Sequence, residues 1–170
     1  MTNPLARLRV LLVDDNIRTI DLVKTMLRGF GFEQFYEATN IADAQQILRT
    51  KPVDLVLLDY ILGPEEGVTL ARWIRANPAS KHEDVPIIIL TGHADRARVV
   101  AARDSGVNEI CVKPFTPADL MKRMLTTFES PRPFIRNPGG YVGPDRRRFR
   151  TEEYLGEKRR SAELSQAAAS

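Results

Sequence analysis

The stretch "RVLLVDDN", residues 9–16, places two adjacent carboxylates, Asp14 and Asp15, directly after a short apolar run. The run contains β-branched valines and ends abruptly in charge, which predicts a buried strand rather than a helix. Neighbouring carboxylates repel one another, so this pair indicates that a positively charged partner binds between them. The end of this strand is therefore a candidate ligand site.

The composition limits the class of protein. A chain of 170 residues with 43% hydrophobic residues has room for one domain and an appendage. No apolar run approaches the ~20 residues that span a bilayer, and the first ten residues lack the layout of a signal peptide. The single cysteine, Cys111, fits a reducing compartment. We therefore expect a soluble cytoplasmic protein that does not enter the membrane.

Apolar runs alternate with helical patterns five times along the chain. The predicted strands span residues 9–15, 32–39, 53–59, 85–91 and 108–115. The predicted helices span residues 17–31, 40–50, 63–77, 95–106 and 116–128. This alternation predicts a parallel α/β sheet covered by helices on both faces, because each parallel connection needs a crossover. Continuous Val, Ile and Leu in the strands favour the same fold.

The composition changes after Glu129. We expect one domain over residues 1–130, followed by a Pro-, Gly- and Arg-rich tail over residues 131–170. The tail contains no hydrophobic periodicity and reads as an extended or disordered arm, with a possible short helix within residues 151–170. Residues 131–150 hold six Arg and one Asp, so the net positive charge of the chain comes from this short segment.

Four predicted strands end in chemically active residues. The first is followed by Asp14 and Asp15, the third ends in Asp59, the fourth ends in Thr91, and the fifth contains Lys113 near its end. In an open parallel sheet, ligands bind beyond the carboxyl ends of the strands. Neighbouring strands would therefore bring three carboxylates, a hydroxyl and an ammonium group into one small crevice.

This set of groups suits phosphoryl transfer with a magnesium ion. Mg²⁺ prefers oxygen ligands and commonly bridges carboxylates to a phosphate, so it would relieve the repulsion between the three aspartates. Asp59 would be both a metal ligand and a nucleophile that forms an aspartyl phosphate. Lys113 would neutralise a phosphoryl oxygen, and the Thr91 hydroxyl would donate a hydrogen bond to another.

The segments "LLVDDN", "VDLVLLDY", "IIILTGHA" and "CVKPF" together resemble the receiver domain of bacterial two-component response regulators. The resemblance covers roughly residues 7–129. It implies a flavodoxin-like (βα)5 three-layer sandwich with a parallel five-stranded sheet in the order 2-1-3-4-5. It also implies that a histidine kinase or a histidine phosphotransfer protein donates a phosphoryl group to Asp59 in a Mg²⁺-dependent phosphorelay.

The resemblance assigns a role to each matching position. Asp14 and Asp15 would be the metal-binding acidic pair, Asp59 the phosphoacceptor, and the main-chain carbonyl of Ile61 a further metal ligand. A protein of this kind is a phosphoacceptor with at most autophosphatase activity, not an enzyme. Its output would be contact with a downstream protein that the sequence does not identify.

Further positions concern the response to phosphorylation. Thr91 would be the switch hydroxyl and Lys113 the cation that senses the phosphate, with the following bond to Pro114 usually cis in this family. Receivers usually have Tyr or Phe three residues before the lysine, whereas this chain has Ile110. The usual aromatic switch is therefore absent at that position.

Two other functions stay open on the sequence. A Mg²⁺-dependent phosphohydrolase of similar fold would use Asp59 as its nucleophile, but it generally needs a second carboxylate two residues later, where this chain has Ile61. Alternatively, the arginine run at residues 144–150 would bind nucleic acid under the control of the domain.

Overall fold

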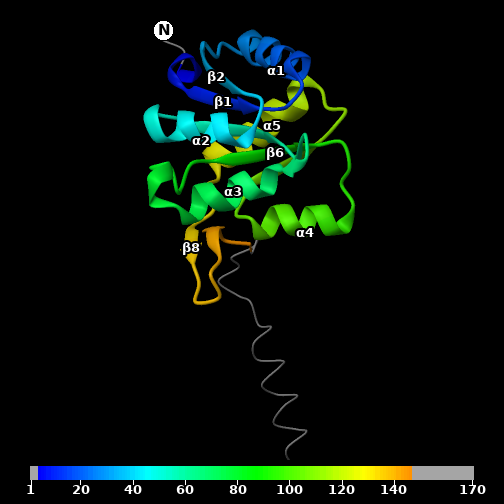
Figure 1. Ribbon diagram of the computed structural model, residues 1–170. Coiled ribbons are helices and arrows are strands. Elements are labelled where there is room, and N and C mark those ends of the chain that lie inside the picture. Colours follow the sequence, from blue (N-terminus) through cyan, green and yellow to red (C-terminus); the bar gives the residue numbers. More distant parts are fainter. Residues whose placement is uncertain (1–3, 147–170) are drawn as a thin grey trace, which may run out of the picture.

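The computed structural model describes residues 4–146 and shows a parallel sheet between two layers of helices (Figure 1). The strands of the sheet are β1 (Arg9–Val13), β2 (Gln34–Ala38), β3 (Leu55–Asp59), β6 (Ile87–Thr91) and β7 (Glu109–Val112). Their order across the sheet is β2-β1-β3-β6-β7. Because β6 and β7 are the fourth and fifth strands of this sheet, the predicted flavodoxin-like order 2-1-3-4-5 is confirmed.

The helices form between successive strands, as the alternation predicts. They are α1 (Ile17–Gly29), α2 (Ile41–Thr50), α3 (Gly67–Ala76), α4 (Arg96–Asp104) and α5 (Pro117–Glu129). Short elements complete the described chain: η1 (Pro4–Arg7), β4 (Ile61–Leu62), β5 (Glu65–Glu66), η2 (Pro78–Ser80), β8 (Phe134–Arg136) and β9 (Val142–Pro144). Among the described helices, none is long and apolar enough to cross a bilayer.

The two faces of the sheet are covered by different helices. On one face, Leu12 of β1 packs in a cluster with residues of α1 and α5; on the other, Leu11 packs with residues of α2, α3 and α4. Successive residues of β1 thus point to opposite faces, and both are fully or almost fully buried. Burial on both faces explains why the strand sequences are continuously apolar rather than alternating.

Side-chain caps fix where several helices begin. Asn16, Asn40 and Asp95 each accept a main-chain N–H from the first turn of the helix that follows. Thr116 and Asp119 form a reciprocal capping box at the start of α5, where Pro117 occupies the first turn. These caps set the lengths of the loops that follow the strands, and those loops contain the candidate site residues.

The strand register brings the carboxyl ends together. Val13 of β1 pairs with Leu58 of β3, and Asp59 pairs with Leu90 of β6. Thr91, the last residue of β6, pairs with Val112 at the end of β7. Residues that follow β1, β3, β6 and β7 therefore lie along one edge of the sheet.

The described part of the tail contains a β hairpin. Strands β8 and β9 pair antiparallel, and they lie beside α3 in the region drawn in orange in Figure 1. The sequence predicts an extended or disordered arm from residue 131, because the segment lacks periodicity. The hairpin forms through a few specific contacts instead, chiefly the burial of Tyr141. The short helix expected within residues 151–170 lies outside the described residues, as does most of the arginine run.

Candidate functional site

Three carboxylates meet at the carboxyl edge of the sheet. Asp14 and Asp15 follow β1, and Asp59 is the last residue of β3, the strand that pairs with β1. One oxygen from each of the three carboxylates lies within 4.8 Å of the others. Asp14 is buried, Asp59 is half-buried and Asp15 is exposed, so the cluster is open to solvent on one side. The convergence predicted from the strand ends is thus present.

Lys113 lies against this cluster. It follows β7, and its ammonium Nζ is 3.0 Å from Asp59 Oδ1 and 3.4 Å from Asp14 Oδ2. The peptide bond between Lys113 and Pro114 is cis, and the Lys113 N–H donates to the carbonyl of Thr91 at 2.7 Å. The loop after β7 therefore holds the lysine over the acidic cluster.

The main chain orients each carboxylate. Asp14, Asp15 and Asp59 each accept one main-chain N–H, from Asn16 at 2.8 Å, Gly63 at 3.0 Å and Tyr60 at 3.0 Å respectively. These bonds occupy one oxygen of each group. Because a carboxylate oxygen has two lone pairs and each group has a second oxygen, acceptor capacity remains for a cation.

Burial dominates the electrostatics of Asp59. Loss of hydration raises the pKa of this carboxyl group above its ordinary value, and the negative charge of Asp14 acts in the same direction. The hydrogen bond and positive charge of Lys113 act against that rise, as does the N–H of Tyr60. The balance leaves a carboxylate whose charge is incompletely compensated by the protein.

The donor set fits a divalent cation. Three carboxylates and one ammonium group leave a formal charge of −2 in a small volume, and a hard dication with oxygen ligands compensates such a charge. Asp14, Asp15 and Asp59 are the side chains available to such an ion. Ile61 lies in β4, two residues after Asp59; the role of its carbonyl as a ligand stays a prediction.

Thr91 ends β6 at the same edge of the sheet. Thr91 is 3% exposed. Its hydroxyl donates to the carbonyl of His93 at 2.8 Å and accepts the His93 N–H at 3.2 Å. The hydroxyl is therefore engaged with its own loop. A phosphoryl group on Asp59 would have to compete with His93 for this hydroxyl, and the switch role of Thr91 stays a prediction.

Tyr60 is a residue that sequence analysis did not single out. It is 3% exposed, and its ring lines a closely packed seam together with Thr91 and Ile110. The guanidinium carbon of Arg98 on α4 lies 5.5 Å from the centre of the Tyr60 ring. The seam thus contains an aromatic ring that comes from the end of β3, whereas β7 contributes the aliphatic Ile110. An aromatic residue directly after a strand-end aspartate was the available sequence signal.

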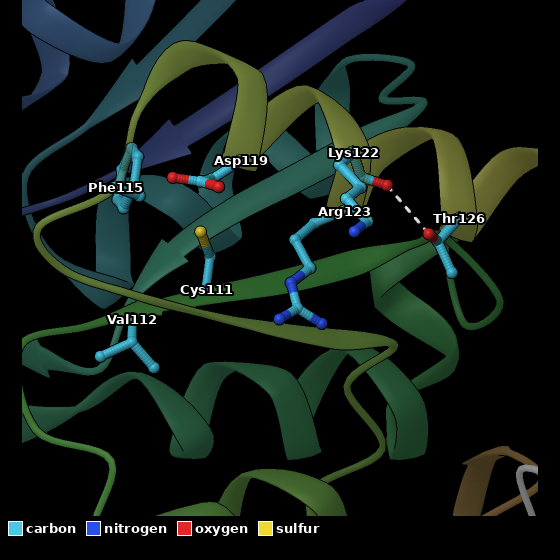
Figure 2. Close-up of a pocket in the computed structure, with 7 residues that line it drawn as sticks. All are labelled: Cys111, Val112, Phe115, Asp119, Lys122, Arg123 and Thr126. Atoms are coloured by element: carbon cyan, nitrogen blue, oxygen red, sulfur yellow. Dashed lines mark hydrogen bonds between the residues drawn. The ribbon is translucent and has the colours of Figure 1, made fainter.

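A separate pocket lies between β7 and α5. Figure 2 shows its lining, and its volume is about 290 Å³. The lining residues are Cys111, Val112, Phe115, Asp119, Lys122, Arg123 and Thr126. This pocket borders the strand that precedes Lys113 but includes none of the three clustered aspartates. Burial raises the pKa of the Cys111 thiol, so this cysteine is a poor nucleophile.

Comparison with known protein families gives one match over most of the chain. Residues 10–125 match the response regulator receiver domain family. This range begins in β1, ends in α5 and includes all the site residues described above.

Individual relatives are also similar over this region. The chemotaxis protein CheY-3 of Vibrio cholerae serotype O1 is 34% identical over 122 residues, which cover 72% of this chain and 92% of that protein. The chemotaxis protein CheY of Pseudomonas aeruginosa is 31% identical over 122 residues, or 72% of this chain and 97% of that protein.

A solved structure resembles this one as well. The receiver domain of a sensor histidine kinase from Pseudomonas aeruginosa has a TM-score of 0.62 and 28% sequence identity, and the match covers 72% of this chain and 98% of that one. That structure has a magnesium ion coordinated in its active site cleft.

Proposed function

The chain belongs to the response regulator receiver domain family, and from that premise we propose that Asp59 accepts a phosphoryl group in a Mg²⁺-dependent phosphorelay. Receiver domains are phosphoacceptors rather than enzymes that turn over a substrate, and the acidic pocket of Asp14, Asp15 and Asp59 is typical of them. A receiver domain implies a histidine kinase as partner. The single observation that supports Asp59 as the acceptor is its position among two further carboxylates and Lys113.

The proposed chemistry transfers a phosphoryl group from nitrogen to oxygen. A carboxylate oxygen of Asp59 attacks the phosphorus of a phosphohistidine on a histidine kinase or histidine phosphotransfer protein. The P–O bond to Asp59 forms as the P–N bond breaks, and the imidazole nitrogen keeps the electron pair and takes a proton from water. The products are an aspartyl phosphate and a neutral histidine.

Positioning and charge compensation do most of the work in such a transfer. Asp14, Asp15 and Asp59, with the carbonyl of Ile61, would hold the magnesium ion, which neutralises charge on the phosphoryl oxygens when bound. Lys113 lies 3.0 Å from Asp59 Oδ1 and would pair with a phosphoryl oxygen after transfer. Thr91 would leave His93 and donate its hydroxyl proton to another oxygen.

The output follows from the same premise. We propose that the protein acts in the cytoplasm and signals through contact with a downstream protein. In the described part of the tail, Arg132, Arg136 and Arg146 already bind acceptors of the domain or of the hairpin, which disfavours them as phosphate-binding groups for nucleic acid. The phosphohydrolase alternative is disfavoured because Ile61 stands where such an enzyme needs a carboxylate.

Phosphoryl labelling tests the proposal. The full chain is incubated with acetyl phosphate and MgCl₂, and intact mass is measured for the wild type and for Asp59→Asn. We expect one phosphoryl group per wild-type chain, a loss of at least about 100-fold in labelling for the variant, and no labelling when EDTA replaces MgCl₂. Asp54→Asn is the matched control, because Asp54 precedes the same strand at the opposite edge of the sheet and pairs with Arg9. Undiminished labelling of Asp59→Asn would contradict the proposal.

A further inference from the structure

The hairpin is held against α3 and α4 by a small set of side-chain contacts. Tyr141 is 7% exposed, and its hydroxyl donates to the carbonyl of Pro144 at 2.7 Å. The guanidinium carbon of Arg146 lies 3.8 Å from the centre of the Tyr141 ring, and its Nη1 is 3.0 Å from Asp104 Oδ1 at the end of α4. Stacking on the ring and pairing with Asp104 fix the same guanidinium from two sides.

Two glycines allow the hairpin to approach this closely. A Cβ on Gly143 would lie 2.7 Å from both the Cα of Gly106 and the hydroxyl oxygen of Tyr141. A Cβ on Gly106 would lie 2.4 Å from the carbonyl oxygen of Val142, and Gly106 has a φ of +86° that disfavours other residues. The contact therefore requires glycine on both sides.

Three positions of the segment make contacts that restrict which residue can stand there. Tyr141, Gly143 and Arg146 depend on the identity of their side chains or on the absence of one. Pro144 accepts the Tyr141 hydroxyl through its main-chain carbonyl, and the main-chain N–H of Asp145 donates to the carbonyl of Pro133 at 2.7 Å. The segment thus has the recognition pattern Tyr-x-Gly-x-x-Arg.

The same pattern occurs a second time in the chain. "YVGPDRR" at residues 141–147 is followed, 13 residues later, by "YLGEKRR" at residues 154–160. Tyr154, Gly156 and Arg159 repeat the three positions whose side chains matter, and Leu155 repeats the aliphatic residue. The two residues that differ, Glu157 and Lys158, stand where Pro144 and Asp145 stand in the first copy. The repetition of the three contact residues links the second copy to the same surface.

We propose that the groove formed by α3, the carboxyl end of α4 and Gly106 is a recognition site for a Tyr-x-Gly-x-x-Arg segment, and that residues 154–159 of the same chain compete with residues 141–146 for it. Seventeen residues, 137–153, separate β8 from Tyr154. A connection of that length keeps both copies at a high effective concentration near the groove. Their relative affinities therefore decide which copy is bound.

A peptide titration tests both parts of the proposal. The probe is a fluorescent peptide of residues 151–162, which has three Glu, two Arg and one Lys and so no net charge to drive non-specific binding. Fluorescence anisotropy measures its affinity for the full wild-type chain, for Tyr141→Ala and for Tyr141→Ala with Tyr154→Ala. Each substitution removes one internal competitor, and we expect each step to tighten binding roughly tenfold.

A charge exchange tests the groove itself. In the chain with both tyrosines replaced, Asp104→Arg is expected to weaken binding of the probe at least about tenfold. A probe with Arg159→Asp should regain affinity for the Asp104→Arg variant. The same probe should lose affinity for the chain that keeps Asp104. A probe with Tyr154→Ala should bind neither chain.

Specific outcomes would overturn the proposal. Equal affinity of all chains for the probe would exclude the groove as its site, and no gain on adding Tyr154→Ala to Tyr141→Ala would exclude competition by the second copy. A second measurement uses the wild-type chain alone. Addition of excess probe should shift the amide NMR signals of Asp104 and Gly106. The absence of those shifts would equally contradict the proposal if Tyr141→Ala failed to fold.

Discussion

The two edges of the central sheet differ in how far the protein compensates the charged side chains that lie there. At the carboxyl edge, Asp14, Asp15 and Asp59 crowd around Lys113, and the protein leaves part of their negative charge uncompensated. At the amino edge, Arg75 is 2% exposed, and its guanidinium is surrounded by neutral acceptors. Those acceptors are the carbonyls of Glu83, Val85 and Gly106 and the side-chain oxygen of Asn108, at 2.7–3.0 Å.

The difference separates a structural charge from a functional one. Arg75 has its hydrogen bonds supplied from the segments before β6 and β7, and its guanidinium carbon lies 5.3 Å from the centre of the Phe134 ring. Burial lowers the pKa of Arg75 to about 10, so it stays charged at neutral pH. Among the described residues, the acidic cluster has Lys113 as its cation and one main-chain N–H for each carboxylate, so part of its charge stays uncompensated until a ligand binds. Incompletely compensated negative charge thus distinguishes the edge of the sheet that contains the candidate functional site.

The largest expected effect on stability is at the amino edge. Arg75→Met keeps the apolar stem but leaves the buried carbonyls of Val85 and Gly106 without their donor, so we expect a loss of about 3 kcal/mol in the free energy of unfolding. Urea unfolding followed by Trp73 fluorescence measures it. Arg72→Met is the matched control on the exposed face of α3, with a change within about 0.5 kcal/mol. A similar loss in both variants would remove the distinction between the two edges.

Alanine substitutions of one glycine at each edge should have different effects on stability and on phosphoryl labelling. Gly106→Ala is expected to cost about 1–3 kcal/mol, because of its positive φ and its contact with Val142, while phosphoryl labelling of the refolded protein persists. A Cβ on Gly67 would lie 2.1 Å from the carbonyl oxygen of Asp59. Gly67→Ala must therefore displace the strand end, and we expect it to slow labelling at least about tenfold. Equal labelling rates in the two variants would contradict this division.

The smallest expected effect concerns Asp59 without a divalent ion. Its raised pKa means that the folded state binds the proton of Asp59 more tightly than the unfolded state does. This contribution to stability is fully present below the ordinary value of 3.8 and is lost as the pH rises through the raised pKa. Asp59→Asn has no such proton, so in EDTA the variant should gain stability relative to the wild type on going from acid to neutral pH.

Thermal unfolding in EDTA at several pH values checks this direction. Magnesium should then narrow or reverse the difference at neutral pH, since a ligand that binds only the folded wild type stabilises it by mass action. A difference between the two proteins that does not vary with pH would show that Asp59 is not under electrostatic stress.

The sheet could be predicted from the sequence because the signals of its strands and helices are local. The apolar run before Asp59 and the capping pattern at Thr116 each fix one element, and the order of strand ends then places Lys113 near Asp59. The hairpin was not predicted, because it depends on long-range contacts such as that between Gly106 and Val142. Tyr60 was missed for the same reason, since only the fold brings its ring beside Ile110.

The docked hairpin also sets the point from which the rest of the polypeptide departs. Arg146, the last described residue, forms an ion pair with Asp104 at the end of α4. This ion pair lies on the side of the molecule opposite to Asp59. A fluorescent protein or affinity tag fused after Ser170 is therefore attached through that remote anchor. Such fusions should leave the approach of a phosphodonor unobstructed, whereas the same cargo inserted in the loop after β7 would stand in its way.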